Sequence, residues 1–202
     1  MNLGEYRVLF LIVIAIVALF VASPALSRLL VYPRTEFLTE LWILGPNHMA
    51  ENYPYNITRG QGYNVFLDVE NRLGYTTYYL VEVKFRNRTQ SAPYDFGPLS
   101  NHTSSNLPSL YNISDFVADE GTWEEPLTFS FDYANTTLST VQMHSLRLNT
   151  VDLNMTGYSI AWDSRRREFS GNLFFELWIY NRTTSVFQYH QRFVSLMLNM
   201  TV

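Results

Sequence analysis

Residues 63–85 read YNVFLDVENRLGYTTYYLVEVKF, and this stretch decides the fold class. Apolar residues recur at every second position from Tyr63 to Val69, with polar residues at 64, 68 and 70 between them. A period of two predicts a β-strand with one buried face. Residues 76–85 repeat the pattern after a turn at 71–74, so the two strands are expected to pair as a hairpin. The second strand would place Glu82 and Lys84 outward and the following side chains inward: Tyr79, Val81, Val83 and Phe85.

The same alternation recurs in three later stretches, at 127–133, 173–179 and 194–200. Residues 146–153 are a weaker candidate for a strand with a change of register. Seven to nine strands without a soluble helix predict an all-β domain over residues 38–202, an antiparallel β-sandwich of immunoglobulin-like type. Residues 90–125, rich in Ser, Asn and Pro, are expected to form a long surface loop inserted in it.

The N-terminal region contains an uncharged apolar run from Val8 to Leu26. As a helix this run would be about 28 Å long, close to the hydrocarbon thickness of a bilayer. It predicts a transmembrane helix at 8–26, after a short cytoplasmic N-terminus at 1–7 and before a stalk at 27–37. A signal peptide cleaved before Leu26 is the alternative, since Ser23 and Ala25 are small residues at the cleavage spacing.

Eight Asn-x-Ser/Thr sequons, the acceptor motif for N-linked glycans, lie beyond the apolar run. Their position predicts a protein of the cell membrane with its N-terminus in the cytoplasm and its C-terminal domain outside. The chain has no cysteine, and dense sequons without disulfides suggest an archaeal cell surface. The predicted glycosylation sites are Asn56, Asn87, Asn101, Asn112, Asn135, Asn154, Asn181 and Asn199.

No pattern of catalytic or metal-binding residues accompanies these features. The formal charge of −4 offers no basic surface for nucleic acid. The four histidines lack the spacing of metal ligands, and no phosphate loop, nucleophile elbow or His-Glu-x-x-His pair occurs. We therefore expect no enzyme, no metal and no cofactor.

Aromatic residues make up 16% of the chain, more than one core requires. Four of them fall on the strand face opposite the expected core: Tyr78, Phe174, Trp178 and Tyr180. They predict either an exposed patch that binds a partner or an outer face covered by another part of the chain.

Four stretches carry a resemblance to a known family: TELWILGP at 39–46, AENYP at 50–54, GTWEEPLT at 121–128 and FELWIYN at 175–181. In this order they resemble the ectodomain of an archaeal membrane family known as domain of unknown function 1616. The resemblance supports the fold but implies no activity, because none is established for the family.

These observations favour a single-pass, N-glycosylated archaeal surface protein whose β-sandwich is a structural or interaction module, or an accessory subunit of an envelope complex. Its expected partners are the lipid bilayer through residues 8–26, N-linked glycans, and an unknown envelope protein or a second copy. One alternative is a pilin-like filament subunit with an apolar helix and a β-rich head. Another is a non-catalytic accessory domain of an envelope glycosyltransferase.

Overall fold

The structure is a computed structural model that describes residues 3–29, 37–137 and 139–201. The chain divides into two compact units, residues 1–37 and 38–202. The first unit contains one helix, α1 (Leu3–Leu29), which includes the apolar run. Within the described residues, no helix meets the length and apolarity needed to cross a membrane. Most of the expected stalk lies outside the described residues.

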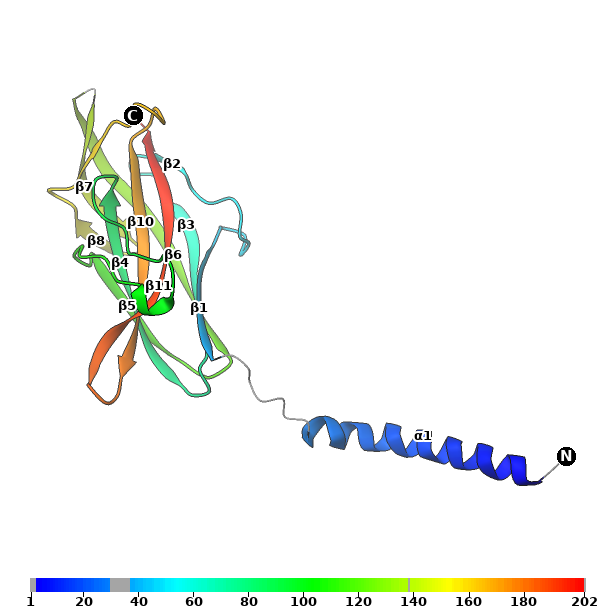
Figure 1. Cartoon of the computed structure of the whole chain (residues 1–202). Helices are drawn as coiled ribbons and strands as arrows, with labels where there is room; N and C mark the ends of the chain where they lie inside the picture. The colour runs from blue at the N-terminus through cyan, green and yellow to red at the C-terminus, as the bar shows by residue number, and fades with distance from the viewer. Residues whose placement is uncertain (1–2, 30–36, 138, 202) are drawn as a thin grey trace. The chain divides into compact units, whose positions relative to one another are not determined.

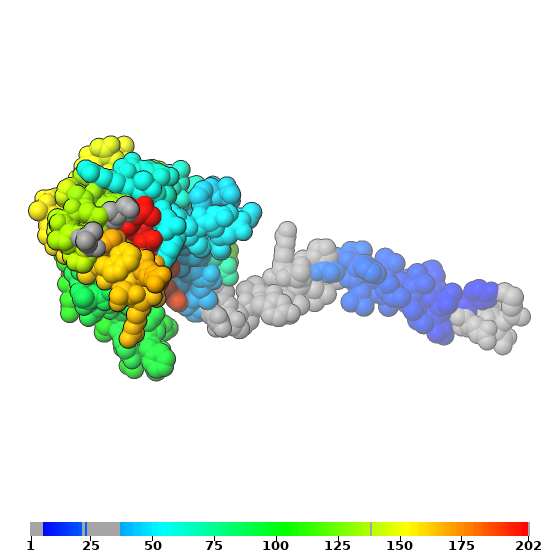
Figure 2. All heavy atoms as spheres, turned by 90° about the horizontal axis from the view of Figure 1, so that it is seen from above, coloured from blue at the N-terminus to red at the C-terminus, as the bar shows by residue number. Residues whose placement is uncertain are grey.

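The second unit consists of two β-sheets in its described part, which confirms the all-β class (Figure 1). The first sheet contains, in order, β1 (Leu38–Leu44), β3 (Tyr63–Arg72), β6 (Gly121–Thr137), β7 (Thr140–Leu148) and β8 (Val151–Asn154), and β9 (Ser159–Ala161) also pairs with β7. The second sheet contains β2 (Asn56–Thr58), β11 (Val186–Thr201), β10 (Ser170–Asn181), β4 (Thr77–Asn87) and β5 (Tyr111–Val117). The pairing of β2 with β11 is parallel, whereas the central pairs of this sheet are antiparallel. Figure 2 shows the end of β11, in red, bordered by the cyan segment that contains β2.

One hydrophobic core takes its side chains from both sheets. The alternation in the sequence identified these side chains correctly in β3, β4 and β6, where the expected inward residues from 65 to 69, 79 to 85 and 127 to 133 are at most 3% exposed. The rings of Phe85 in β4 and Phe131 in β6 lie 5.6 Å apart and join the sheets. Burial of this apolar surface is the main force that holds the sheets together.

The expected hairpin between residues 63–70 and 76–85 is wrong. Strand β3 pairs with β1 and β6, whereas β4 pairs with β10 and β5, so the chain crosses from one sheet to the other between them. The Asn71 side chain holds this crossing, because its amide nitrogen donates to the carbonyls of Tyr75 at 2.8 Å and Val117 at 2.9 Å. A period of two shows which side chains face the core, but it does not show which sheet a strand joins.

The expected loop at 90–125 is only partly irregular. Its second half forms β5 and the start of β6, while residues 88–110 contain one 3-10 turn, η1 (Leu99–Asn101), and an isolated bridge between Tyr94 and Thr103. Strand β5 is an edge strand with mostly exposed side chains, and so its sequence lacks a clear alternation. The weaker candidate at 146–153 spans two strands, β7 and β8, joined at Asn149, whose φ is 52°.

Candidate functional site

The outer face of the five-stranded sheet carries the side chains of β4 and β10 that point away from the core. The registers place Glu176 beside Glu82 and Trp178 beside Leu80 across this pair of strands. One end of the face is open, while residues 88–110, here called the covering segment, lie over the other end (Figure 1). Side chains at the open end are therefore accessible to solvent, whereas those at the covered end are buried under this segment.

Four aromatic rings gather at the open end. Tyr78 stacks on Phe116 with ring centroids 4.3 Å apart, and Phe187 lies 5.3 Å from Tyr78 and 5.4 Å from Tyr180. We call Tyr78, Phe116, Tyr180 and Phe187 the aromatic cluster. Three of them, Tyr78, Phe116 and Tyr180, line a cavity of about 890 Å³, and Phe116 is 67% exposed.

The structure brings together only part of the predicted patch. Tyr78 and Tyr180 belong to the aromatic cluster, but Phe174 is 1% exposed, so its expected place in an exposed patch is wrong. Trp178 is partly buried, and its ring packs edge-on against Tyr189 at 5.6 Å. Of the two alternatives, a covered outer face applies to the end that holds Phe174, and an exposed patch applies to the other end. Sequence reasoning missed Phe116, because it assigned residues 90–125 to a loop.

The covered end contains Lys84, which is the only lysine in the chain; the other thirteen of its fourteen Lys and Arg residues are arginine. Lys84 was expected to point outward from the core, and on this outer face it is covered, with an exposure of 3%. Its Nζ lies 2.7 Å from Oε2 of Glu176, 2.9 Å from Oε2 of Glu82 and 3.5 Å from Oγ of Ser105. We call these four residues the lysine cluster.

Glu176 is fully buried in this cluster, with an exposure of 0%. The backbone N–H of Ser105 in the covering segment donates to its Oε1 at 2.7 Å. The Trp178 ring centroid lies 5.9 Å from Nζ of Lys84. Burying an amine between two carboxyl groups has a large desolvation cost, and a charged side chain that only improved solubility would lie on the surface. No sequence signal pointed here except the single lysine, whose significance depends on its burial.

The model of the family described as Domain of unknown function (DUF1616) matches residues 33–143, which is more than half of the chain. The chain belongs to this family. No curated protein matches it. In this DUF1616 chain the match includes Tyr78, Lys84 and Phe116, while Glu176 and Tyr180 lie beyond it.

The predicted glycosylation sites of the DUF1616 chain differ in their surroundings. Three of them are partly buried, namely Asn87, Asn181 and Asn199, and the other five are exposed. At 87, 154 and 181 the Asn Oδ1 accepts the backbone N–H of the Thr two residues later, at 3.0, 2.8 and 2.9 Å. These turns follow strands, and the Asn-x-Thr sequence fits both the hydrogen bonding of the turn and the acceptor motif for a glycan. Glycosylation itself stays a prediction.

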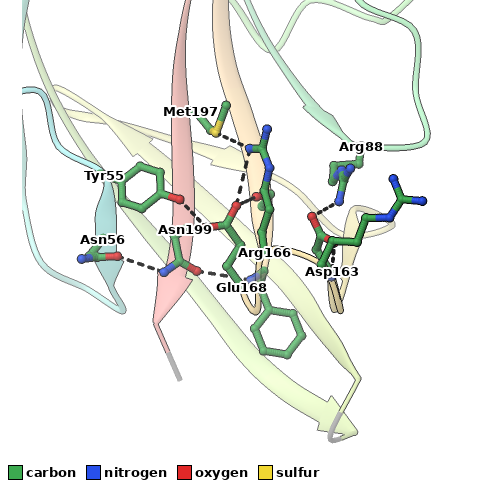
Figure 3. A network of polar contacts seen from close by, with 11 residues as sticks. Tyr55, Asn56, Arg88, Asp163, Arg166, Glu168, Met197 and Asn199 are labelled. Atoms are coloured by element: carbon green, nitrogen blue, oxygen red, sulfur yellow. Dashed lines mark hydrogen bonds and ion pairs between the residues drawn. The ribbon is translucent and has the colours of Figure 1, made fainter.

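Two of these asparagines contact each other in a network of polar side chains (Figure 3). Nδ2 of Asn199 donates to Oδ1 of Asn56 at 2.9 Å, and Oδ1 of Asn199 accepts the N–H of Phe169 at 3.2 Å. Glu168 accepts from Tyr55 and pairs with Arg166 at 3.6 Å. Burial raises the pKa of Glu168, but the hydrogen bonds from Ser170 and Tyr55 and the charge of Arg166 together hold that pKa below its ordinary value. The network fixes the turn at 163–168 against β2 and β11.

The histidines of the DUF1616 chain do not converge, and the described residues hold no group of three His, Asp or Glu side chains placed to bind a metal ion. Nε2 of His190 lies 2.9 Å from Oγ1 of Thr39, which in turn contacts the hydroxyl of Tyr79 at 2.8 Å. Burial, with a smaller effect from the charge of Arg192, lowers the pKa of His190 to about 4. This histidine is therefore a neutral hydrogen-bonding partner between the two sheets.

Proposed function

We propose that this chain is a single-pass, N-glycosylated protein of an archaeal cell surface, whose β domain is an immunoglobulin-like sandwich without catalytic activity. The domain would serve as a structural or interaction module, or as an accessory subunit of an envelope complex. Its partner would be an envelope protein or a second copy of the chain, bound at the aromatic cluster.

The anchor is supported by the apolar side chains of α1. From Val8 to Val21, the large apolar side chains are between 47% and 76% exposed. Apolar surface of this extent is unfavourable in water and favourable in lipid. The sequence of the helix contains no charged residue between Arg7 and Arg28.

The aromatic cluster is the observation that carries the interaction role. Phe116 and Tyr75 are more than half exposed beside the cavity, and the lining supplies amide groups from Asn181 and Gln188 and a guanidinium group from Arg182. Aromatic side chains surrounded by polar groups are typical of protein interfaces. Their rings bury a large area at a small cost in side-chain entropy.

Cross-linking in membranes of the source organism would test this role. A photoreactive amino acid at position 75, on the cavity rim, should yield a discrete cross-linked species in the full chain. Phe116→Ser should abolish that species, because it removes the most exposed ring of the cluster. Phe96→Ser is the matched control, since Phe96 is 77% exposed but is not among the residues that line the cavity. An unchanged species in Phe116→Ser, or its equal loss in both variants, would contradict binding at the aromatic cluster.

A further inference from the structure

The buried lysine cluster has the components of an amide-forming site. It holds one amine, Lys84, which is the only lysine in the chain. Two carboxyl groups contact the amine nitrogen, at 2.7 Å for Glu176 and 2.9 Å for Glu82. The cluster belongs to neighbouring central strands, β4 and β10, and the covering segment shields it from water.

We propose that Lys84 and Glu176 condense to form an intramolecular amide bond that links β4 to β10. The bond would join Nζ of Lys84 to the side-chain carboxyl carbon of Glu176. Glu82 would act as the proton carrier, and the backbone N–H of Ser105 would stabilise the charge that develops on Oε1. The proposal goes beyond the surface role proposed above and does not depend on it.

The positions of the atoms suit this reaction. Nζ lies 2.7 Å from Oε2, and so it is already beside the carbon that carries this oxygen. Reactions between groups held in contact gain much of their rate from this proximity. The N–H of Ser105 donates to Oε1 at 2.7 Å, which is the arrangement of an oxyanion hole for a tetrahedral intermediate.

The condensation would also remove charge from a buried site. One ammonium and two carboxylates would leave a net negative charge in a site where Glu176 is fully buried. Keeping charged groups in a buried site is costly, and an amide in place of the ion pair would remove two of these charges. The neutral amine and the neutral carboxylic acid are the forms that condense.

The step balances without another reactant. Nζ of the neutral amine attacks the carboxyl carbon of protonated Glu176, and a C–N bond forms. The carboxylate of Glu82 takes a proton from the nitrogen and passes it to Oε2. The C–Oε2 bond then breaks, and Oε2 leaves as water with that proton and its own. Glu82 returns to a carboxylate, and no oxidant or reductant is needed.

The choice of lysine instead of arginine favours a covalent reaction over an ion pair alone. Arginine makes the stronger bidentate pair with a carboxylate, and the remaining thirteen Lys and Arg positions of this chain are all arginine. A guanidinium stays protonated and does not act as a nucleophile under these conditions, whereas a desolvated lysine amine does. The chain also has no cysteine, so a domain exposed outside the cell would lack disulfide cross-links.

Intact mass spectrometry of the denatured full chain tests the bond directly. The chain is produced in a host without N-glycosylation, so that its mass depends on the polypeptide alone. We expect the wild-type mass to be lower than the sequence mass by one water molecule. Digestion should yield one branched peptide that contains both Lys84 and Glu176. An amine-reactive label should modify the denatured chain once, at its α-amino group, because no free lysine remains.

Variants assign the roles of the residues. Lys84→Arg keeps a cation in the site but should have the full sequence mass, and Glu82→Gln should slow or abolish the loss of water. Glu176→Gln should give the same product mass as the wild type, because the amide would then form with loss of ammonia. A wild-type chain at its full sequence mass, labelled at both amines, would overturn the proposal whatever the variants do.

Discussion

Asp68 shows how a single side chain in this domain sets a dependence on pH. It is 3% exposed in β3, opposite Glu124 of β6, and its Oδ2 has no hydrogen-bond partner among the described residues. Burial raises its pKa to about 6, and the nearby charge of Glu124 adds to this effect. The carboxylate is therefore a destabilising group at neutral pH, and its protonated form is the one that the fold accepts.

Replacement of Asp68 by Asn should stabilise the domain at neutral pH. The native state binds more protons than the unfolded state between pH 4 and pH 6, so this side chain costs stability as the pH rises through that range. The cost reaches at most about 3 kcal/mol above pH 6. We expect the free energy of unfolding of Asp68→Asn to exceed that of the wild type at pH 7, and the two to converge near pH 4.

Denaturant unfolding of the full chain in detergent, followed by circular dichroism at both pH values, measures this difference. His190 has the opposite dependence, because its lowered pKa makes the native state resist protonation as the pH falls from 6.5 to 4. Its contribution is common to variant and wild type and cancels in the comparison. A gain for Asp68→Asn that is the same at pH 4 and pH 7 would show that the carboxylate is not the cause.

At the scale of elements, the start of strand β10 packs closely against the core. Gly171 lies between Asn87 of β4 and Leu198 of β11. A Cβ atom at this position would lie 2.5 Å from Cζ of Phe85 and 3.2 Å from Cδ1 of Ile160, both in the core. The small residue is thus required by the rings that join the two sheets.

Gly171→Ala should therefore destabilise the domain by about 1–3 kcal/mol through overpacking. Gly62→Ala is the matched control, because the nearest atom to its added Cβ would be Cγ2 of Thr128 at 3.8 Å. Thermal unfolding of the two variants should show a lowered midpoint for the first and little change for the second. Equal midpoints for the two variants would mean that Phe85 shifts without cost.

The elements also show what could be predicted from the sequence. Alternation identified the buried faces of β3, β4, β6 and β10 because each strand has one apolar side against the core. It failed for β5, whose side chains are mostly exposed at the edge of a sheet. It also failed for the pairing of β3 with β4, since two strands that face one core can belong to different sheets.

The candidate site was predictable only where it is open. Tyr78 and Tyr180 were identified from their place on the outer strand face, and the structure adds Phe116 and Phe187 to them. The burial of Phe174 and Lys84 was not predictable, because it depends on how the covering segment folds over the sheet. Contacts between segments far apart in the sequence leave no periodic signal in either segment.

At the scale of the whole molecule, the chain combines an apolar helix with a β domain that carries eight sequons and the exposed aromatic cluster. Five of the sequon asparagines are exposed, which is what a glycan acceptor requires. Asn112 and Asn135 are two of these exposed asparagines. We propose from these features that the domain faces the outside of the cell.

Glycopeptide mass spectrometry of the chain purified from membranes of the source organism tests that claim most directly. We expect glycans on the peptides that contain Asn112 and Asn135. Sequon peptides recovered at their unmodified masses at all eight positions would contradict an exported, glycosylated domain.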